Sequence, residues 1–264
     1  MHLRHWQLFI KGMAVAFLAY WLHLGTQVND WLGSDGFHVV SPASLVFRPL
    51  PEPMPSCLWW MVLLGTALMF FRRTLPVGCV LAGGGFFYAT MTDLESAGAL
   101  NMNFLFGFAV IFWSSGLPSD PSLTLSAWPV YLIRIYLVVV YFGSGWRKAV
   151  FGDWLTNPDA LIHCMTGFYA TDFTRYLFLI LPPLAWTFMQ YGVIVFELGA
   201  PLLLLAPALR KWGILMGCLL HLGIALLMRD LVYFSLQMLA FYIPFLIPVT
   251  DSPPESRKSP QEGI

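Results

Sequence analysis

Charged residues are scarce in this 264-residue chain. Asp, Glu, Lys and Arg make up only 11% of it, whereas 58% of the residues are hydrophobic. A soluble globular domain is about a quarter charged, so an ordinary soluble domain is excluded. The pattern predicts an all-α polytopic membrane protein whose partner is the lipid bilayer. The net charge is zero and no basic block occurs, which argues against a nucleic-acid partner.

The usual signatures of metal and phosphate chemistry are also missing. The four cysteines have no metal-ligand spacing, and there is no HExxH, CxxC, phosphate-binding loop or serine-centred elbow. The sequence therefore predicts no metal site. Cys57 and Cys164 are both expected on the outer side, where an oxidising compartment would allow a disulfide. Lys11 interrupts the first apolar run, which favours a retained first helix over a cleaved signal peptide.

Apolar runs predict about eight transmembrane helices, because some 20 apolar residues can cross a bilayer. The expected spans are Leu8 to Leu24, Cys57 to Phe71, Leu75 to Met91, Asn103 to Trp113, Trp128 to Trp146, Leu184 to Leu205, Gly213 to Met228 and Leu231 to Val249. Together they form one transmembrane domain over residues 1–249. The polar, proline-rich residues 250–264 are expected to be a disordered cytoplasmic tail.

The basic residues predict that both termini are cytoplasmic, because cytoplasmic loops are enriched in Lys and Arg. This topology places three polar segments outside, of which the longest is Arg147 to Pro183. Within it, residues Asp159 to Tyr169 have apolar side chains at helical spacing and predict a helix lying in the interface. A functional site is therefore expected on the outer face.

Lys148 is the first candidate for that site. It lies at the outer end of a span, and Arg134, Tyr141 and Lys148 share a helix face because they are seven residues apart. Arg147 and Lys148 could extend to lipid headgroups beside Trp146. Alternatively, Lys148 faces a semi-buried cavity, where desolvation makes the neutral amine available as a base.

Glu197 and His221 are the other candidates, because ionisable groups inside a span usually face the bundle interior. Gln190 precedes Glu197 by seven residues on the same helix face, and Pro201 follows it by four. A structural role for Glu197 would be pairing with Arg134 or a hydrogen bond to His221. Gly217 and Gly223 flank His221 and would allow a close helix contact.

These residues resemble the HTTM (horizontally transferred transmembrane) domain, which vitamin K-dependent gamma-carboxylase shares with many bacterial membrane proteins. The resemblance is carried by Tyr141, Ser144-Gly145, Lys148 and Trp154, and by Glu197 to Pro201 followed by Arg210 and His221. It implies a bacterial inner-membrane location. It also implies that Lys148 is the base that deprotonates a reduced quinone, with Glu197 and His221 orienting it.

The sequence departs from that family in two places. Met102 stands within Asn101-Met102-Asn103, where the carboxylase has a catalytic histidine, and the large lumenal domain is absent. Full glutamate carboxylation is therefore not expected. The candidate substrate-binding residues are Tyr141, Arg147, Trp154, Arg134, Asn101 and Asn103.

Two classes of function remain open from the sequence. One is an enzyme with an outer-facing polar cavity, which performs quinol-dependent oxidoreductase or carboxylase-like chemistry or modifies a secreted peptide. The other is a non-enzymatic membrane binding or immunity-type protein, in which the same polar groups only hold helices together.

Overall fold

The computed structural model describes residues 3–34, 46–92, 98–115, 127–166, 170–229 and 231–247. All regular structure in these ranges is helical, as predicted. The longer helices are α1 (Leu3–Leu24), α3 (Met54–Leu68), α4 (Leu75–Thr92), α5 (Ala99–Ser115), α6 (Trp128–Val150), α9 (Pro183–Leu205), α10 (Arg210–Leu227) and α11 (Val232–Tyr242). The shorter ones are the 3₁₀ helices η1 (Gly25–Gln27) and η3 (Ile243–Leu246), and α2 (Val28–Leu32), α7 (Ala160–Met165) and α8 (Asp172–Ile180).

Eight helices lie where the sequence predicts spans, but eight complete crossings are not confirmed. In the described part of the chain, five helices are long and apolar enough to cross a membrane: α1, α4, α6, α9 and α10. The other three (α3, α5 and α11 with η3) are shorter apolar segments. A helix of 15 residues such as α3 is about 22 Å long, less than the roughly 30 Å hydrocarbon core.

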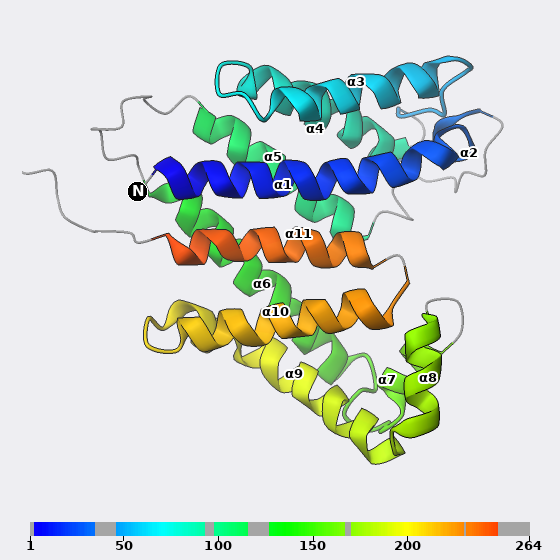
Figure 1. The fold of residues 1–264 in the computed structure, drawn as a ribbon, viewed down its shortest axis with the longest axis vertical. Helices are drawn as coiled ribbons and strands as arrows, with labels where there is room; N and C mark the ends of the chain where they lie inside the picture. The colour runs from blue at the N-terminus through cyan, green and yellow to red at the C-terminus, as the bar shows by residue number, and fades with distance from the viewer. Residues whose placement is uncertain are drawn as a thin grey trace, which may run out of the picture.

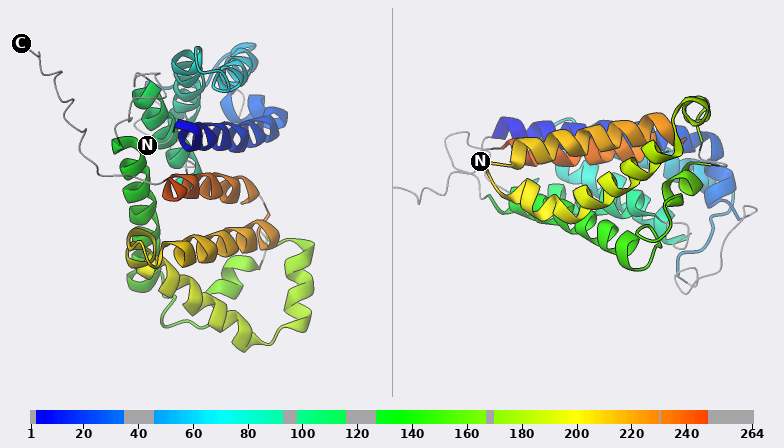
Figure 2. Two further views of the ribbon diagram at one scale, coloured as in Figure 1. Left: turned by 60° about the vertical axis from the view of Figure 1, so that its left-hand side comes forward. Right: turned by 90° about the horizontal axis from the view of Figure 1, so that it is seen from below.

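The helices stack side by side along the long axis of the molecule. Figure 1 shows α1, α11 and α10 next to one another, with α3 and α4 at one end and α9, α7 and α8 at the other. Helix α6 runs behind α11 and α10 and crosses them obliquely, as the turned views in Figure 2 also show. Its main packing partner is α9. Helices α6 to α10 therefore build the α7/α8 end of the bundle.

Close helix packing follows from glycine at defined positions. On α3, a Cβ at Gly65 would lie 2.5 Å from the backbone nitrogen of Ala82 on α4. A Cβ added at Gly78 on α4 would lie 2.7 Å from the carbonyl oxygen of Gly65. Only residues without a side chain permit such backbone contact between membrane helices.

The outward-facing side chains of the long helices are apolar. Val139 on α6 and Val195 and Leu202 on α9 are each more than half exposed. Large exposed apolar surfaces of this kind mark contact with lipid or a partner. Together with the five long apolar helices, they support an integral membrane protein.

The arrangement of the turns agrees with the predicted alternation of the chain. The helices run across the long axis, so the molecule also has two sides at which helices begin and end. The start of α1, the α3–α4 turn and the α9–α10 turn lie on one of these sides, whereas α2, α7 and α8 lie on the other (Figure 1). The basic pairs Arg72-Arg73 and Arg210-Lys211 lie in or next to those turns, on the same side as the start of α1. This is the arrangement that the charge bias predicts, and the cytoplasmic location of that side stays a prediction.

Two sequence predictions need correction in this part of the chain, and the disulfide that the sequence left open is not formed. The single interfacial helix predicted from Asp159 to Tyr169 is instead α7, which ends at Met165, while residues 167–169 lie outside the described residues. A second short helix, α8, was not predicted; the Thr171 hydroxyl caps its start by accepting a 3.1 Å hydrogen bond from the Thr174 backbone nitrogen. The cysteines Cys57 and Cys164 are free, because α3 and α7 lie at opposite ends of the long axis (Figure 1). The predicted tail, 250–264, lies outside the described residues.

Candidate functional site

The candidate site is an ion pair between α6 and α9. The Lys148 ammonium lies 2.5 Å from Oε1 and 2.7 Å from Oε2 of Glu197. It also donates to the Ser144 hydroxyl at 2.9 Å, and that hydroxyl donates to Glu197 Oε1 at 3.3 Å. Lys148 and Ser144 reach Glu197 together because they are four residues apart on one face of α6. The family resemblance implied that Glu197 orients Lys148, and the structure pairs the two side chains directly.

Helix α6 approaches α9 closely because Gly145, which follows Ser144, faces the α9 backbone at Glu197 and Leu198. A Cβ at this position would lie 2.9 Å from the Glu197 Cβ and 3.0 Å from the Leu198 backbone nitrogen. The absence of a side chain therefore sets the helix separation at which Lys148 and Glu197 meet. Gly143, two residues earlier on the same helix, has nothing within 4 Å of an added Cβ.

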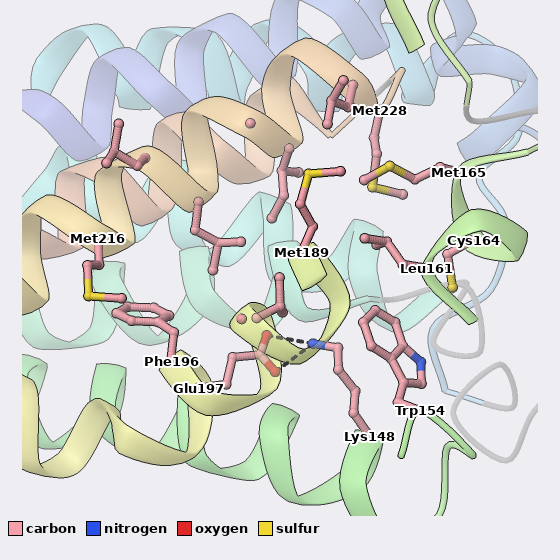
Figure 3. Close-up of a pocket in the computed structure, with 17 residues that line it drawn as sticks. Lys148, Trp154, Leu161, Cys164, Met165, Met189, Phe196, Glu197, Met216 and Met228 are labelled. Carbon is pink, nitrogen blue, oxygen red and sulfur yellow. Dashed lines mark hydrogen bonds and ion pairs between the residues drawn. The ribbon is translucent and has the colours of Figure 1, made fainter. Parts of the chain in front are cut away.

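The ion pair forms part of the wall of a cavity of about 500 Å³. Figure 3 shows the Lys148 and Glu197 side chains directed toward each other at its edge, with Trp154 beside them. The other lining residues are uncharged: Trp154, Leu161, Cys164, Met165, Met189, Gly192, Val193, Phe196, Met216, Leu219, Leu220, Gly223, Ile224, Leu227 and Met228. The cavity lies among α6, α7, α9 and α10, and its wall is mainly apolar.

The two charged groups differ in how far they are shielded. The Lys148 side chain is 24% exposed and that of Glu197 is 8% exposed. The Lys148 ammonium also lies 5.2 Å from the centre of the Trp154 ring, close enough for a cation–π interaction. A molecule in the cavity could therefore contact the cation without disrupting the interior of the bundle. This geometry is that of a cavity residue and not of a lysine extended to lipid headgroups.

Gln190 is a site residue that the sequence reasoning did not single out. Its amide nitrogen donates to the carbonyl oxygens of Trp154 and Asn157, at 2.6 and 2.7 Å. Its amide oxygen accepts from the Leu161 backbone nitrogen at 2.8 Å. These three bonds attach the loop that carries Trp154, and the start of α7, to α9. The signal in the sequence was a glutamine within an apolar span; the structure shows that it is fully buried, where an amide needs hydrogen-bond partners.

Replacing Gln190 with leucine is expected to loosen this loop. The change removes three hydrogen bonds, each of which contributes about 1 kcal/mol. It leaves the Trp154 carbonyl oxygen and the Leu161 N–H without the glutamine, whereas the Asn157 carbonyl oxygen still accepts from the Ala160 N–H. We expect faster amide hydrogen exchange at Leu161, the residue whose N–H binds Gln190 directly. Tyr191→Phe is the control, because its hydroxyl makes only a 3.4 Å contact with the exposed Leu155 carbonyl oxygen. Unchanged exchange at Leu161 in the leucine variant would contradict the assigned role.

His221 does not orient Lys148 or Glu197, contrary to the prediction. Its Nε2 lies 2.6 Å from the Tyr141 hydroxyl, and Tyr141 also hydrogen-bonds the Tyr242 hydroxyl. All three side chains are buried. This cluster joins α6, α10 and α11 inside the bundle and does not line the cavity. The close contact predicted at Gly217 is present, because Gly217 packs directly against the Tyr242 hydroxyl.

Arg134 has a structural role and does not pair with Glu197. Its guanidinium donates from Nε and Nη2 to the Pro244 carbonyl oxygen, at 3.1 and 2.9 Å. Nη2 also donates to the Ile247 carbonyl oxygen at 2.6 Å. The side chain therefore satisfies the carbonyl groups at the end of η3. It is 5% exposed and does not line the cavity.

The remaining predicted binding residues separate into two groups. Trp154 lines the cavity, whereas Arg147 is exposed beside it and does not. Asn101 and Asn103 are buried on α5, where their side-chain oxygens accept from the Tyr20 and Tyr136 hydroxyls at 3.2 and 2.7 Å. Neither lines the cavity, so in this structure both tie helices together.

Cys164 lines the cavity from α7 and is also exposed. Partial burial raises the pKa of its thiol; the Lys148 ammonium opposes this shift, and the Asp153 carboxylate adds to it. The thiolate is the reactive form of cysteine, so mildly alkaline pH favours its reaction. Within the described residues, no cluster of His, Cys, Asp and Glu could hold a metal ion.

No protein-family model, curated protein or solved structure matches this chain. A function must therefore be inferred from the ion pair and the cavity beside it.

Proposed function

We propose that this integral membrane protein binds an apolar ligand with an acidic hydroxyl group, and that the Lys148–Glu197 pair accepts the proton of that hydroxyl. The observation that carries the proposal is one ion pair exposed to a cavity of about 500 Å³ whose other lining residues are uncharged. Pockets with an apolar wall and a few convergent polar groups are the usual sites for small ligands. A reduced quinone fits this chemistry, because it joins phenolic hydroxyls to an apolar body.

The ion pair determines which group receives the proton. An ammonium–carboxylate pair has one vacant proton site, and it lies on the carboxylate. The O–H bond of the ligand would break, the proton would move to Glu197, and the electron pair would stay on the ligand oxygen. Lys148 would remain charged and pair with the new anion. Glu197 is therefore the immediate proton acceptor in this proposal, and Lys148 stabilises the product.

The proposal extends the resemblance to the HTTM family but assigns the roles differently. The family pattern makes Lys148 the base, and Glu197 and His221 its orienting groups. Here His221 is engaged by Tyr141 at 2.6 Å, so it has no part in the proton transfer. We place the cavity on the outer face of a bacterial inner membrane, with cytoplasmic termini, as part of the same proposal.

The test is an anaerobic titration of the purified protein with menadiol, followed by ultraviolet difference spectra that distinguish the neutral quinol from its anion. We expect anion formation in the wild type and loss of the anion signal in Glu197→Gln. Lys148→Met should weaken binding about tenfold or more, because a hydrogen bond to a charged group contributes about 1.5–3 kcal/mol. Arg147→Gln is the matched control: it removes the neighbouring, exposed cation, and both binding and spectrum should be retained.

The same pair bridges α6 and α9, and this favours a second candidate, a non-enzymatic binding or immunity-type protein. In that case the ligand would bind as the neutral quinol in every variant, or menadiol would not bind at all. Either result would overturn the proton-transfer proposal.

A further inference from the structure

Part of the cavity forms a slot between α9 and α10, and residues of α6 and α7 complete its wall. Its α9 wall runs from Met189 to Glu197 and its α10 wall from Met216 to Leu227. Eleven residue steps on α10 correspond to about 17 Å. A quinol ring held at Glu197 would occupy only part of this length, and the rest of the wall is apolar. Figure 3 shows the methionine side chains Met189, Met216 and Met228 extending into this region.

Among the residues that line the slot, methionines and glycines differ most in how far they can adapt to a ligand. Four methionines line it (Met165, Met189, Met216 and Met228), and their unbranched side chains can rearrange around different ligands. Gly192 on α9 and Gly223 on α10 also line it, and there the wall is backbone. Because backbone in a helix cannot rearrange, the shape of the slot is fixed at the two glycines.

Helix packing does not require either glycine. A Cβ at Gly192 or Gly223 would meet nothing within 4 Å, in contrast to Gly145 and Gly217, which lie against neighbouring helices. Glycine also weakens a helix relative to other residues. The two positions are therefore open toward the cavity without a role in holding α9 or α10.

We propose that Gly192 and Gly223 determine the ligand specificity of the cavity, by leaving space between α9 and α10 for an apolar chain attached to the head group at Glu197. The occupant is an alkyl or isoprenoid chain, because the slot is uncharged beyond the ion pair, continuous with it, and bounded by α9 and α10, which are long and apolar enough to cross a membrane. The identity of the head group rests on the proposed function; the chain-binding role of the glycines does not.

Leucine substitutions at glycine test this proposal with controls inside the same chain. Gly84 and Gly143 also have nothing within 4 Å of an added Cβ, but neither lines the cavity. All four glycines are helical, so the four leucine variants should fold alike. Only Gly192→Leu and Gly223→Leu place a side chain in the slot.

The readout is the modification rate of Cys164, which lines the same cavity, measured by site-resolved mass spectrometry with N-dodecylmaleimide and N-ethylmaleimide at mildly alkaline pH. We expect Gly192→Leu and Gly223→Leu to slow the dodecyl reagent about tenfold relative to the ethyl reagent. This is the effect of a roughly tenfold loss in the affinity of the slot for the dodecyl chain. Gly84→Leu and Gly143→Leu should leave the ratio unchanged, which also controls for partition into detergent.

Equal rate ratios in all four variants would overturn the proposal, as would equal slowing of both reagents. Anion formation from menadiol, a quinol with no chain, should persist in Gly192→Leu. If menadiol is never deprotonated but the dodecyl reagent is slowed selectively, the slot is supported and only the proposed chemistry fails.

Discussion

Replacing Lys148 with methionine is expected to lower the free energy of unfolding by about 3 kcal/mol, the lower part of the range for breaking a buried ion pair. The change leaves the Glu197 carboxylate, 8% exposed, without its cation in the apolar wall of the cavity. The lower value applies because Lys148 is itself partly exposed, at 24%. The measurement is reversible unfolding in detergent, monitored by tryptophan fluorescence.

The double variant Lys148→Met/Glu197→Met separates the ion pair from the individual charges. Replacing a whole buried pair with apolar residues is often neutral or stabilising, whereas removing one partner is not. We therefore expect the double variant to be more stable than either single variant, with a large coupling energy in the double-mutant cycle. Arg147→Gln should change stability by less than about 0.5 kcal/mol. Additive effects of the two single changes would show that the pair contributes nothing as a pair.

Gly145→Ala is expected to separate α6 from α9 at the ion pair. The added methyl would lie 3.0 Å from the Leu198 backbone nitrogen and 2.9 Å from the Glu197 Cβ, and neither atom belongs to a flexible side-chain end. Overpacking of this kind destabilises by about 1–3 kcal/mol. The variant should also lose anion formation from menadiol, because the distance between Lys148 and Glu197 depends on this contact.

Gly143→Ala is the matched control for this change. It adds the same methyl two residues earlier on α6, where nothing lies within 4 Å, and it gains up to about 1 kcal/mol from the better helix propensity of alanine. The two variants should therefore differ by a few kcal/mol in opposite directions relative to wild type. Equal stability of Gly143→Ala and Gly145→Ala would contradict the close α6–α9 contact.

The site shows which inferences local spacing can support. Ser144 and Lys148 share a helix face by their separation of four residues, and this was readable from the sequence. Spacing could not show that Glu197 faces them, which only the family resemblance implied, or that His221 faces Tyr141, because these residues lie on different helices. Arg134 illustrates the same limit: its buried charge suggested a carboxylate partner, and its partners are the backbone carbonyl groups of Pro244 and Ile247.

The glycines divide in the same way. A close helix contact was predicted at the two glycines that flank His221, and Gly217 confirms it. Gly145 makes a similar contact that was not predicted. Gly223 was expected to behave like Gly217, yet it faces the cavity. The sequence shows where glycine stands in a helix. Whether that position contacts the backbone of a neighbouring helix or opens into a cavity depends on how the helices pack.

The sequence by itself determined the helical class, the positions of eight apolar helices, the apolar surface that suits a bilayer, and the identity of the two ionisable groups Lys148 and Glu197. These follow from composition and from a period of 3.6 residues, which are properties of short stretches of chain. Only the tertiary structure decided the pairing of Lys148 with Glu197, the attachment of the Trp154 loop by Gln190, and the slot between α9 and α10. Each of these depends on the separation and crossing of helices distant in sequence, which is set by side-chain packing across the whole bundle.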